Sequence, residues 1–175
     1  RRREVRASNR IIKVKALKKL LFVDVETSGL KITKNSFITQ LAYYYENGKK
    51  KGYRDIKKDI YKNFMGDLDK FVDRYDKADK MYLIGYNINF DADWMRSMFL
   101  RNKNEFFGSY FFYPPIDVMQ LAAYKFMKNN IHPENFKLST VCRAMKIRVD
   151  DKNLHDALYD ISITRQLYNK LIKMK

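Results

Sequence analysis

The sequence predicts an α/β protein built on a central mixed β-sheet flanked by α-helices. Three strand-like segments come first, at about residues 19–26, 37–46 and 50–56, and Asn47-Gly48 between the last two is a strong hairpin signal. Segments with helical spacing of apolar residues then alternate with one further short strand. This order favours three antiparallel strands followed by parallel strands.

The composition is that of a single folded domain. The chain has 175 residues, enough for a proper core, and its 46% hydrophobic content is too high for a disordered chain. It contains no apolar run near the ~18 residues of a membrane span, and no hydrophobic segment follows the basic N-terminus. We therefore expect a cytoplasmic protein that is neither secreted nor bound to a membrane. The single cysteine, Cys142, excludes an internal disulfide and is expected in the core.

The charge is strongly basic, which favours a polyanionic partner. The net charge is +16, and nucleic acid is the commonest partner of such a protein. Residues 1–20 hold nine Lys/Arg and one acid. We treat residues 1–18 as a basic N-terminal extension, flexible because like charges repel, and residues 19–175 as the folded domain. A solvated tail has the same composition, and the alternating residues 11–17 are also compatible with a short strand.

The segment KLLFVDVETSGL, residues 19–30, begins as a buried strand and ends in two acids. Because side chains alternate along a strand, Asp24 and Glu26 project from one face and Val25 from the other. Two adjacent carboxylates at the end of an apolar strand repel each other and lose hydration. A hard cation such as Mg²⁺ or Mn²⁺ would neutralise them. The alternative is a strand end whose acids point into water.

The third strand, Lys50 to Ile56, is expected at an edge of the sheet because it carries many cations. Lysine on an edge strand protects against aggregation, and a nucleic-acid contact explains the same residues equally well.

The later segments predict helices and one buried strand. A strand at Met81 to Ile84 stops at Gly85 and leads into a helix that opens near Asp91. Pro114-Pro115 excludes a helix in residues 106–117. The other helices are expected at residues 60–78, with Ile60, Phe64, Leu68, Val72 and Tyr75 buried, then after the N-cap Asp117, and at residues 137–147 and 156–174.

Three later residues add to the two acids of the first strand. Asp91 follows the second buried strand and reaches the same end of the sheet if the two strands are neighbours; the alternative is an acid favoured by the helix dipole. His155 is best placed just before the last helix, and Asp160 on its first turns, facing the sheet. A buried, unpaired carboxylate is costly, so a metal ion accounts for Asp160. Asp156 is expected to cap the helix.

Three motifs carry a resemblance to a known family. VDVETSGL, GYNINFDADWM and HDALYD stand in the order and spacing of the three motifs of the DEDDh, or DnaQ-like, 3′–5′ exonucleases, and the resemblance covers about residues 20–171. FITQLAYYY, PPIDVMQLA and KLSTVCRAMKI are similar to the family's second strand, its Asp-bearing segment and its short helix before the third motif. Tyr86 departs from the pattern, because members often carry histidine there, and so does the basic extension.

The resemblance implies a ribonuclease H-like fold and a two-metal phosphodiesterase that releases mononucleotides from 3′ ends. Asp24, Glu26, Asp91 and Asp160 would hold two divalent ions, Mg²⁺ or Mn²⁺, with Asp24 between them. His155 would take the proton from the attacking water, and imidazole suits this role because its ordinary pKa near 6.5 lies close to working pH.

The resemblance also implies four substrate contacts. Leu30 would wedge against the last base, although a packing residue is the alternative, and the backbone around Thr27 would hold the 3′ end. Asn87 and Phe90, both in the second motif, complete the expected set.

Three functions are compatible with these residues. The first is a metal-dependent 3′–5′ exonuclease acting on DNA or RNA, favoured because all four acids and the histidine are present. The second is a catalytically inactive module that binds nucleic acid or a polymerase, and the third is an unrelated α/β metal-dependent nuclease or phosphatase. An exonuclease could proofread within a replication complex, trim RNA ends or degrade short oligonucleotides, and the basic charge favours longer substrates over dinucleotides.

Overall fold

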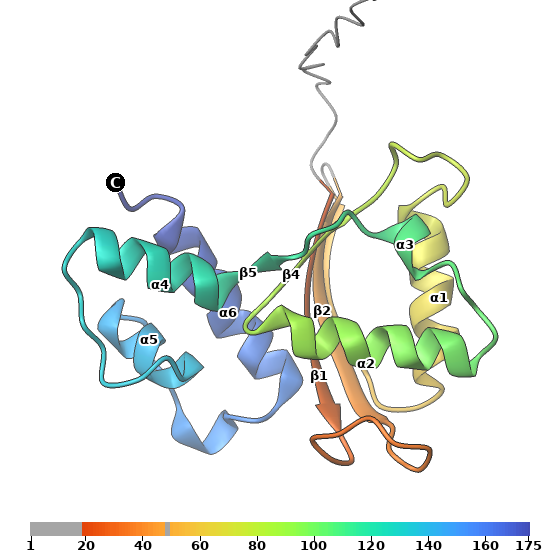
Figure 1. Cartoon of the computed structure of the whole chain (residues 1–175), viewed down its shortest axis with the longest axis horizontal. Helices are drawn as coiled ribbons and strands as arrows, with labels where there is room; N and C mark the ends of the chain where they lie inside the picture. The colour runs from red at the N-terminus through yellow and green to blue at the C-terminus, as the bar shows by residue number, and fades with distance from the viewer. Residues whose placement is uncertain (1–18, 48–49) are drawn as a thin grey trace, which may run out of the picture.

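A computed structural model describes residues 19–47 and 50–175. Its strands form one sheet in the order β3-β2-β1-β4-β5 (Figure 1). The pairs β1–β2 and β2–β3 are antiparallel, and the pairs β1–β4 and β4–β5 are parallel. The predicted mixed sheet is therefore confirmed. The strands are β1 Lys19–Thr27, β2 Ile38–Asn47, β3 Lys50–Ile56, β4 Tyr82–Gly85 and β5 Ile116–Asp117.

Helices cover both faces of this sheet (Figure 1). One face packs against α1, α2 and α3, and the other packs against α4, α5 and α6. None of the helices in the described ranges is long and apolar enough to cross a membrane. The helices are α1 Ile60–Phe71, α2 Ile88–Arg101, α3 Phe107–Tyr110, α4 Val118–Lys128, α5 Leu138–Ala144, the 3-10 turn η1 Asp151–Asn153 and α6 Ala157–Leu171.

Two predictions fall on residues outside the described ranges. They are the basic extension at residues 1–18, with the short strand considered there, and the hairpin turn at Gly48. The pairing of Asn47 with Lys50 and of Tyr44 with Tyr53 nevertheless confirms the hairpin that joins β2 and β3, and β3 is an edge strand as predicted.

The alternation along β1 decides which core each residue enters. Leu21, Val23 and Val25 lie in the core shared with α1 and α2. Phe22 lies in the opposite core, with α4 and α6. Because alternate side chains share a face, Asp24 and Glu26 project toward the α6 side, as predicted. The buried thiol of Cys142 lies in this second core, also as predicted.

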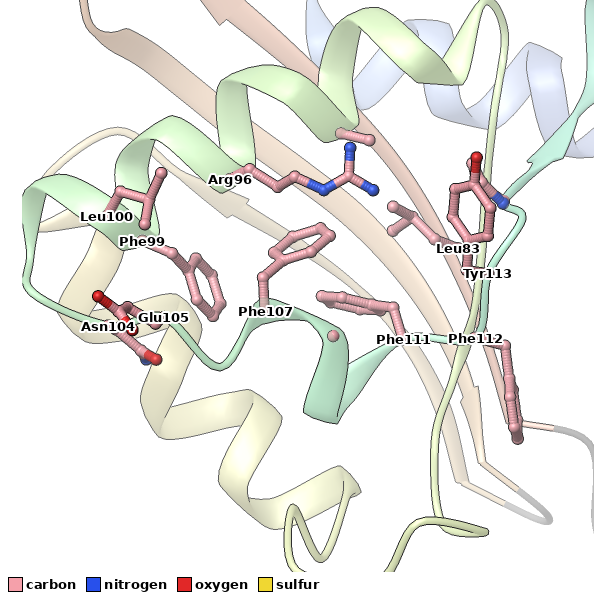
Figure 2. Close-up of a pocket in the computed structure, with 13 residues that line it drawn as sticks. Leu83, Arg96, Phe99, Leu100, Asn104, Glu105, Phe107, Phe111, Phe112 and Tyr113 are labelled. Carbon is pink, nitrogen blue, oxygen red and sulfur yellow. The ribbon is translucent and has the colours of Figure 1, made fainter.

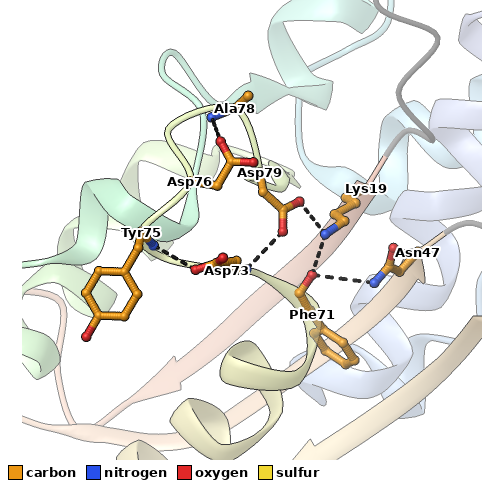
Figure 3. A network of polar contacts seen from close by, with 8 residues as sticks. All are labelled: Lys19, Asn47, Phe71, Asp73, Tyr75, Asp76, Ala78 and Asp79. Carbon is orange, nitrogen blue, oxygen red and sulfur yellow. Dashed lines mark hydrogen bonds and ion pairs between the residues drawn. The ribbon is translucent and has the colours of Figure 1, made fainter.

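The predicted helix at residues 60–78 is wrong in its second half, because α1 ends at Phe71. Tyr75, predicted to be buried, is 82% exposed. Figure 3 shows the local hydrogen bonds that replace the helix: Asp73 accepts from the N–H of Tyr75 at 3.0 Å, and Asp76 accepts from the N–H of Ala78 at 2.8 Å. Short acidic side chains that bond to nearby backbone compete with helix formation.

The same loop is fastened to the start of β1. Lys19 forms an ion pair with Asp79 and donates a hydrogen bond of 2.7 Å to the carbonyl oxygen of Phe71 (Figure 3). Asp79 in turn accepts from the N–H of Asp73 at 2.9 Å. These bonds satisfy the last carbonyl of α1 and hold the loop at the end of the sheet opposite the acids of β1.

The later helices follow the predicted pattern with one addition. Asp117 and Asp156 cap α4 and α6, each accepting hydrogen bonds from backbone N–H groups of the first turn. The one-turn helix α3 contradicts the prediction that residues 106–117 contain none. It ends at Tyr110, before the prolines, which restrict only their own positions and the residue before them.

Candidate active site

The site begins at the carboxyl end of β1. Asp24 is opposite Ala42 and Glu26 is opposite Gln40 in the pairing with β2, so both acids stand on the α6 side of the sheet. Both are partly buried. The strand continues to Thr27, and the chain bends at Ser28-Gly29.

Asp91 reaches the same end of the sheet from the first turn of α2. Its side chain is only 3% exposed, and its Oδ1 accepts a hydrogen bond of 3.0 Å from the backbone N–H of Val25. Because β4 lies parallel to β1, the turn after β4 places this helix beside the two acids. The condition on which the placement of Asp91 depended, that the two strands are neighbours, is therefore met.

The turn between β4 and α2 depends on two unusual backbone positions. Asn87 has a φ of 58°, a left-handed conformation, and it precedes the first residue of the helix. A Cβ on Gly85 would lie 2.9 Å from the carbonyl oxygen of Val23, so only glycine lets β4 approach β1 this closely. Both features bring the start of α2, and therefore Asp91, against β1.

His155 and Asp160 come from the start of α6. His155 is exposed, has a φ of 69°, and directly precedes the N-cap residue Asp156. Its backbone N–H donates to Oδ2 of Asp160 at 3.4 Å. One ligand atom from each of Glu26, His155 and Asp160 lies within 4.8 Å of the other two. The structure therefore brings together residues that are far apart in the sequence.

The carboxylates raise one another's pKa. Burial, followed by the charges of Asp91, Asp160 and Glu26, raises the pKa of Asp24 well above its usual range. Burial also raises the pKa of Asp91, to about 8, against the opposing effect of the hydrogen bond from Val25. Burial raises the pKa of Glu26 and of Asp160, and the charge of Asp160 adds to the shift of Glu26.

This donor set suits a hard divalent cation. Clustered acids that disfavour each other's ionisation are relieved by a bound cation, and carboxylate oxygens are the ligands that Mg²⁺ and Mn²⁺ prefer. Oδ1 of Asp160 is buried and has no hydrogen-bond partner within residues 19–47 and 50–175. A metal ligand is the role that satisfies such an atom.

The residues expected to contact substrate lie at or just after the ends of β1 and β4. Leu30 is 87% exposed, which contradicts a packing role. The Thr27 hydroxyl donates to the carbonyl oxygen of Gly29 at 2.7 Å and shapes the turn that carries Leu30. Asn87 is exposed, and the half-buried Phe90 has its ring centroid 6.1 Å from that of Trp94. Their contact with a substrate stays a prediction.

Two residues belong to the site that sequence reasoning treated as unremarkable. Asp117, predicted only as an N-cap, also accepts a hydrogen bond of 3.1 Å from the N–H of Asn87, and its charge adds to the raised pKa of Asp91. The side-chain amide of Gln40 donates hydrogen bonds to Asp55 at 3.0 Å and to Asp156 at 3.4 Å. These bonds depend on the register between β2 and β3, which no sequence pattern indicates.

A separate cavity of about 230 Å³ lies between α2, α3 and the segment that leads to β5 (Figure 2). Five of its thirteen lining residues are aromatic, and the guanidinium of Arg96 stands 5.2 Å from the ring centroid of Phe107. None of the five candidate catalytic residues lines it. The candidate chemistry is therefore at the strand ends rather than in this cavity.

Comparison with known families agrees with the fold. The family model of the RNase H superfamily matches residues 21–159, most of the chain. The match includes Asp24, Glu26, Asp91 and His155 and ends one residue before Asp160. No curated protein matches the sequence. The match supports a nuclease-type function and the predicted ribonuclease H-like fold. The chain belongs to the RNase H superfamily.

Proposed function

We propose that the chain is a metal-dependent 3′–5′ exonuclease of the DEDDh type, which hydrolyses phosphodiester bonds at the 3′ ends of DNA or RNA and releases mononucleotides. The observation that carries this proposal is the meeting of Glu26, His155 and Asp160 within 4.8 Å, beside the partly buried Asp24 and the buried Asp91. A histidine beside clustered acids supplies a base in addition to metal ligands.

Asp24, Glu26, Asp91 and Asp160 would hold two divalent ions, Mg²⁺ or Mn²⁺. When bound, such ions supply a nucleophilic water and neutralise the charge on the leaving 3′ oxygen. The chain prepares the ligands: the N–H of Val25 occupies one oxygen of Asp91 and leaves the other free to bind. The N–H of His155 similarly orients Oδ2 of Asp160.

His155 would be the general base. Its exposed position at the rim of the acid cluster lets the imidazole take a proton from the attacking water and pass it to solvent. The left-handed backbone of His155 and the cap formed by Asp156 fix where the loop ends and α6 begins. A short, fastened loop holds the imidazole beside Glu26 and Asp160.

The exposed Leu30 would pack against the terminal base, and the turn shaped by Thr27 would hold the 3′ end. The basic charge of the chain favours polynucleotide substrates. A role in proofreading, with a polymerase or replication complex as partner, is a further prediction of this proposal.

The proposal is tested with 5′-labelled DNA and RNA, single- and double-stranded, incubated with Mg²⁺ or Mn²⁺. We expect a ladder that shortens from the 3′ end and that is abolished by chelator and by Asp24→Ala. Asp76→Ala, which removes an acid at the opposite end of the sheet, should leave the ladder unchanged. Tight binding with no shortening would instead identify a nucleic-acid-binding module.

A further inference from the structure

The edge strand β3 leads toward the candidate site. Both β1 and β3 are antiparallel to β2, so they run in the same direction and their carboxyl ends lie at the same end of the sheet. Just beyond β3, the ammonium of Lys57 lies 3.9 Å from a carboxylate oxygen of Asp156, the residue that follows His155. The end of β3 is therefore next to the start of α6.

Alternate residues of β3 share the face that carries Asp24 and Glu26. Tyr53 contacts Tyr44, whose core contains α6, and Asp55 accepts a hydrogen bond from Gln40. By alternation, Lys51 and Lys57 lie on the same face as Tyr53 and Asp55. The α6 side of β3 and of the residue just beyond it is thus the row Lys51, Tyr53, Asp55 and Lys57, in which an aromatic residue and an acid paired with Lys57 stand between two lysines.

Tyr53 forms a partly exposed platform. The centroid of its ring is 4.8 Å from the centroid of the Tyr44 ring, and Tyr53 is 44% exposed. The guanidinium of Arg165, from α6, stands 3.9 Å from the centroid of the Tyr44 ring and donates a hydrogen bond of 3.3 Å to the hydroxyl of Tyr53. The exposed ring therefore packs against Tyr44 and has a cation at its hydroxyl group.

The platform lies within reach of the acids. Asp24, Ala42 and Asp55 form one row across β1, β2 and β3, and Tyr53 is two residues before Asp55. Two strand spacings of ~4.8 Å and two residues of ~3.3 Å give a separation of about 12 Å between the Cα atoms of Asp24 and Tyr53. A single strand of nucleic acid covers this distance with a few nucleotides.

The cations of this row are available to phosphates. Lys51 and Lys57 are exposed. The contacts of Lys57 with Asp55 and Asp156, at 3.4 Å and 3.9 Å, are surface ion pairs that contribute little and exchange readily. Among the described residues, Lys51 takes part in no ion pair.

From this arrangement we infer a second binding site, for the part of a single-stranded polynucleotide that lies 5′ of the cleaved bond. A base stacks on Tyr53 beside Arg165, and the flanking phosphates contact Lys51 and Lys57. Aromatic platforms set among cations are how proteins hold single strands without reading their sequence. This inference rests on the proposed exonuclease function and names its substrate as a strand of several nucleotides.

The test compares the full chain with Tyr53→Ala and Tyr53→Phe on a ten-nucleotide single strand and on a dinucleotide. We expect Tyr53→Ala to lower the ratio of the two kcat/KM values, long over short, by about tenfold. This loss should arise from KM. Tyr53→Phe keeps the ring and should restore the ratio. An unchanged ratio in Tyr53→Ala, or an equal loss on both substrates, overturns the inference.

Binding measurements separate this inference from the proposed function. The affinity for the labelled ten-nucleotide strand, measured with chelator present, should fall about tenfold in Tyr53→Ala whether or not the protein cleaves it. Lys51→Glu should weaken binding more at low salt than at high salt, because phosphate contacts release counterions. Lys77→Glu, the same charge change in the loop between α1 and β4, is the control, and equal effects of the two would overturn the inference.

Discussion

The backbone N–H of Val25 donates a hydrogen bond of 3.0 Å to Oδ1 of Asp91. This bond joins the middle of the acid pair on β1 to the first turn of α2. It orients a buried carboxylate and opposes the repulsion from the two other acids. The position of Asp91 is therefore set by the strand that carries Asp24 and Glu26, and the cluster is built into the fold.

Stability without metal should fall as the pH rises. Burial and mutual repulsion raise the pKa values of Asp24, Asp91 and Asp160 in the folded state above the ordinary ~4. Between the ordinary pKa of the unfolded carboxyl groups and their raised pKa in the folded state, the folded state binds more protons than the unfolded state. The unfolding free energy therefore decreases from about pH 4 toward pH 8. The increase in Tm caused by Mg²⁺ should accordingly be larger at pH 8 than at pH 5.5, and calorimetric scans at both pH values measure it. An equal or smaller increase at pH 8 would contradict the proposed ligands.

Asp24→Asn should stabilise the metal-free protein. The substitution removes one charge from a cluster whose members repel one another, so Tm in chelator should rise by a few degrees. The same variant should lose the Tm increase caused by Mg²⁺ and at least about a thousandfold in kcat, because a charged ligand is gone. A lower Tm in chelator would show that Asp24 stabilises the fold directly.

His155→Ala should separate the base from the ligands. We expect kcat to fall by about 10²- to 10⁴-fold, the usual contribution of a general base. The Tm increase caused by Mg²⁺ should be retained, because the four carboxylates are still present. If that increase disappears as well, His155 is a ligand, as its place in the group with Glu26 and Asp160 would also allow.

Gly85→Ala should destabilise the protein and disturb the site. The added Cβ would lie 2.9 Å from the Val23 carbonyl oxygen and 2.7 Å from Cδ1 of Ile88, so the strands or the helix must shift. We expect a loss of about 1–3 kcal/mol in the unfolding free energy, measured by denaturant titration. Gly66→Ala is the matched control: nothing lies within 4 Å of its Cβ, and it should stabilise α1 by about 0.5–1 kcal/mol.

Leu30→Ala should affect substrate binding without affecting stability. Because Leu30 is 87% exposed, its truncation should change the unfolding free energy by less than about 0.5 kcal/mol. Loss of the contact with the terminal base should raise KM about five- to tenfold. An unchanged KM would remove Leu30 from the substrate site.

Local sequence patterns predict most of the fold because apolar residues recur with the strand period in the strands and with the helical period in the helices. The acids of β1, the hairpin pairing of β2 with β3 and the capping acids Asp117 and Asp156 all lie where such patterns place them. The end of α1 could not be predicted in this way. The apolar spacing continues through Val72, but local bonds of Asp73 and Asp76 end the helix.

The site is predictable only where a motif marks it. The five candidate catalytic residues follow from the resemblance, and the structure brings them to one end of the sheet. Gln40 and the second bond of Asp117 depend on strand order and register, which the sequence does not state. The boundary between a basic extension at residues 1–18 and a folded domain at residues 19–175 stays a prediction, and so does a cytoplasmic location.

Removal of nucleotides from 3′ ends by this acid cluster is tested by the position of a label on the substrate. One oligonucleotide is labelled at its 3′-terminal nucleotide and, in a second sample, at its 5′ end, and both are incubated with the protein and Mg²⁺. We predict that the 3′ label appears first as a mononucleotide while the 5′ label passes through a shortening ladder. Release of the 5′ label as a mononucleotide, or early fragments cut internally, would contradict the account.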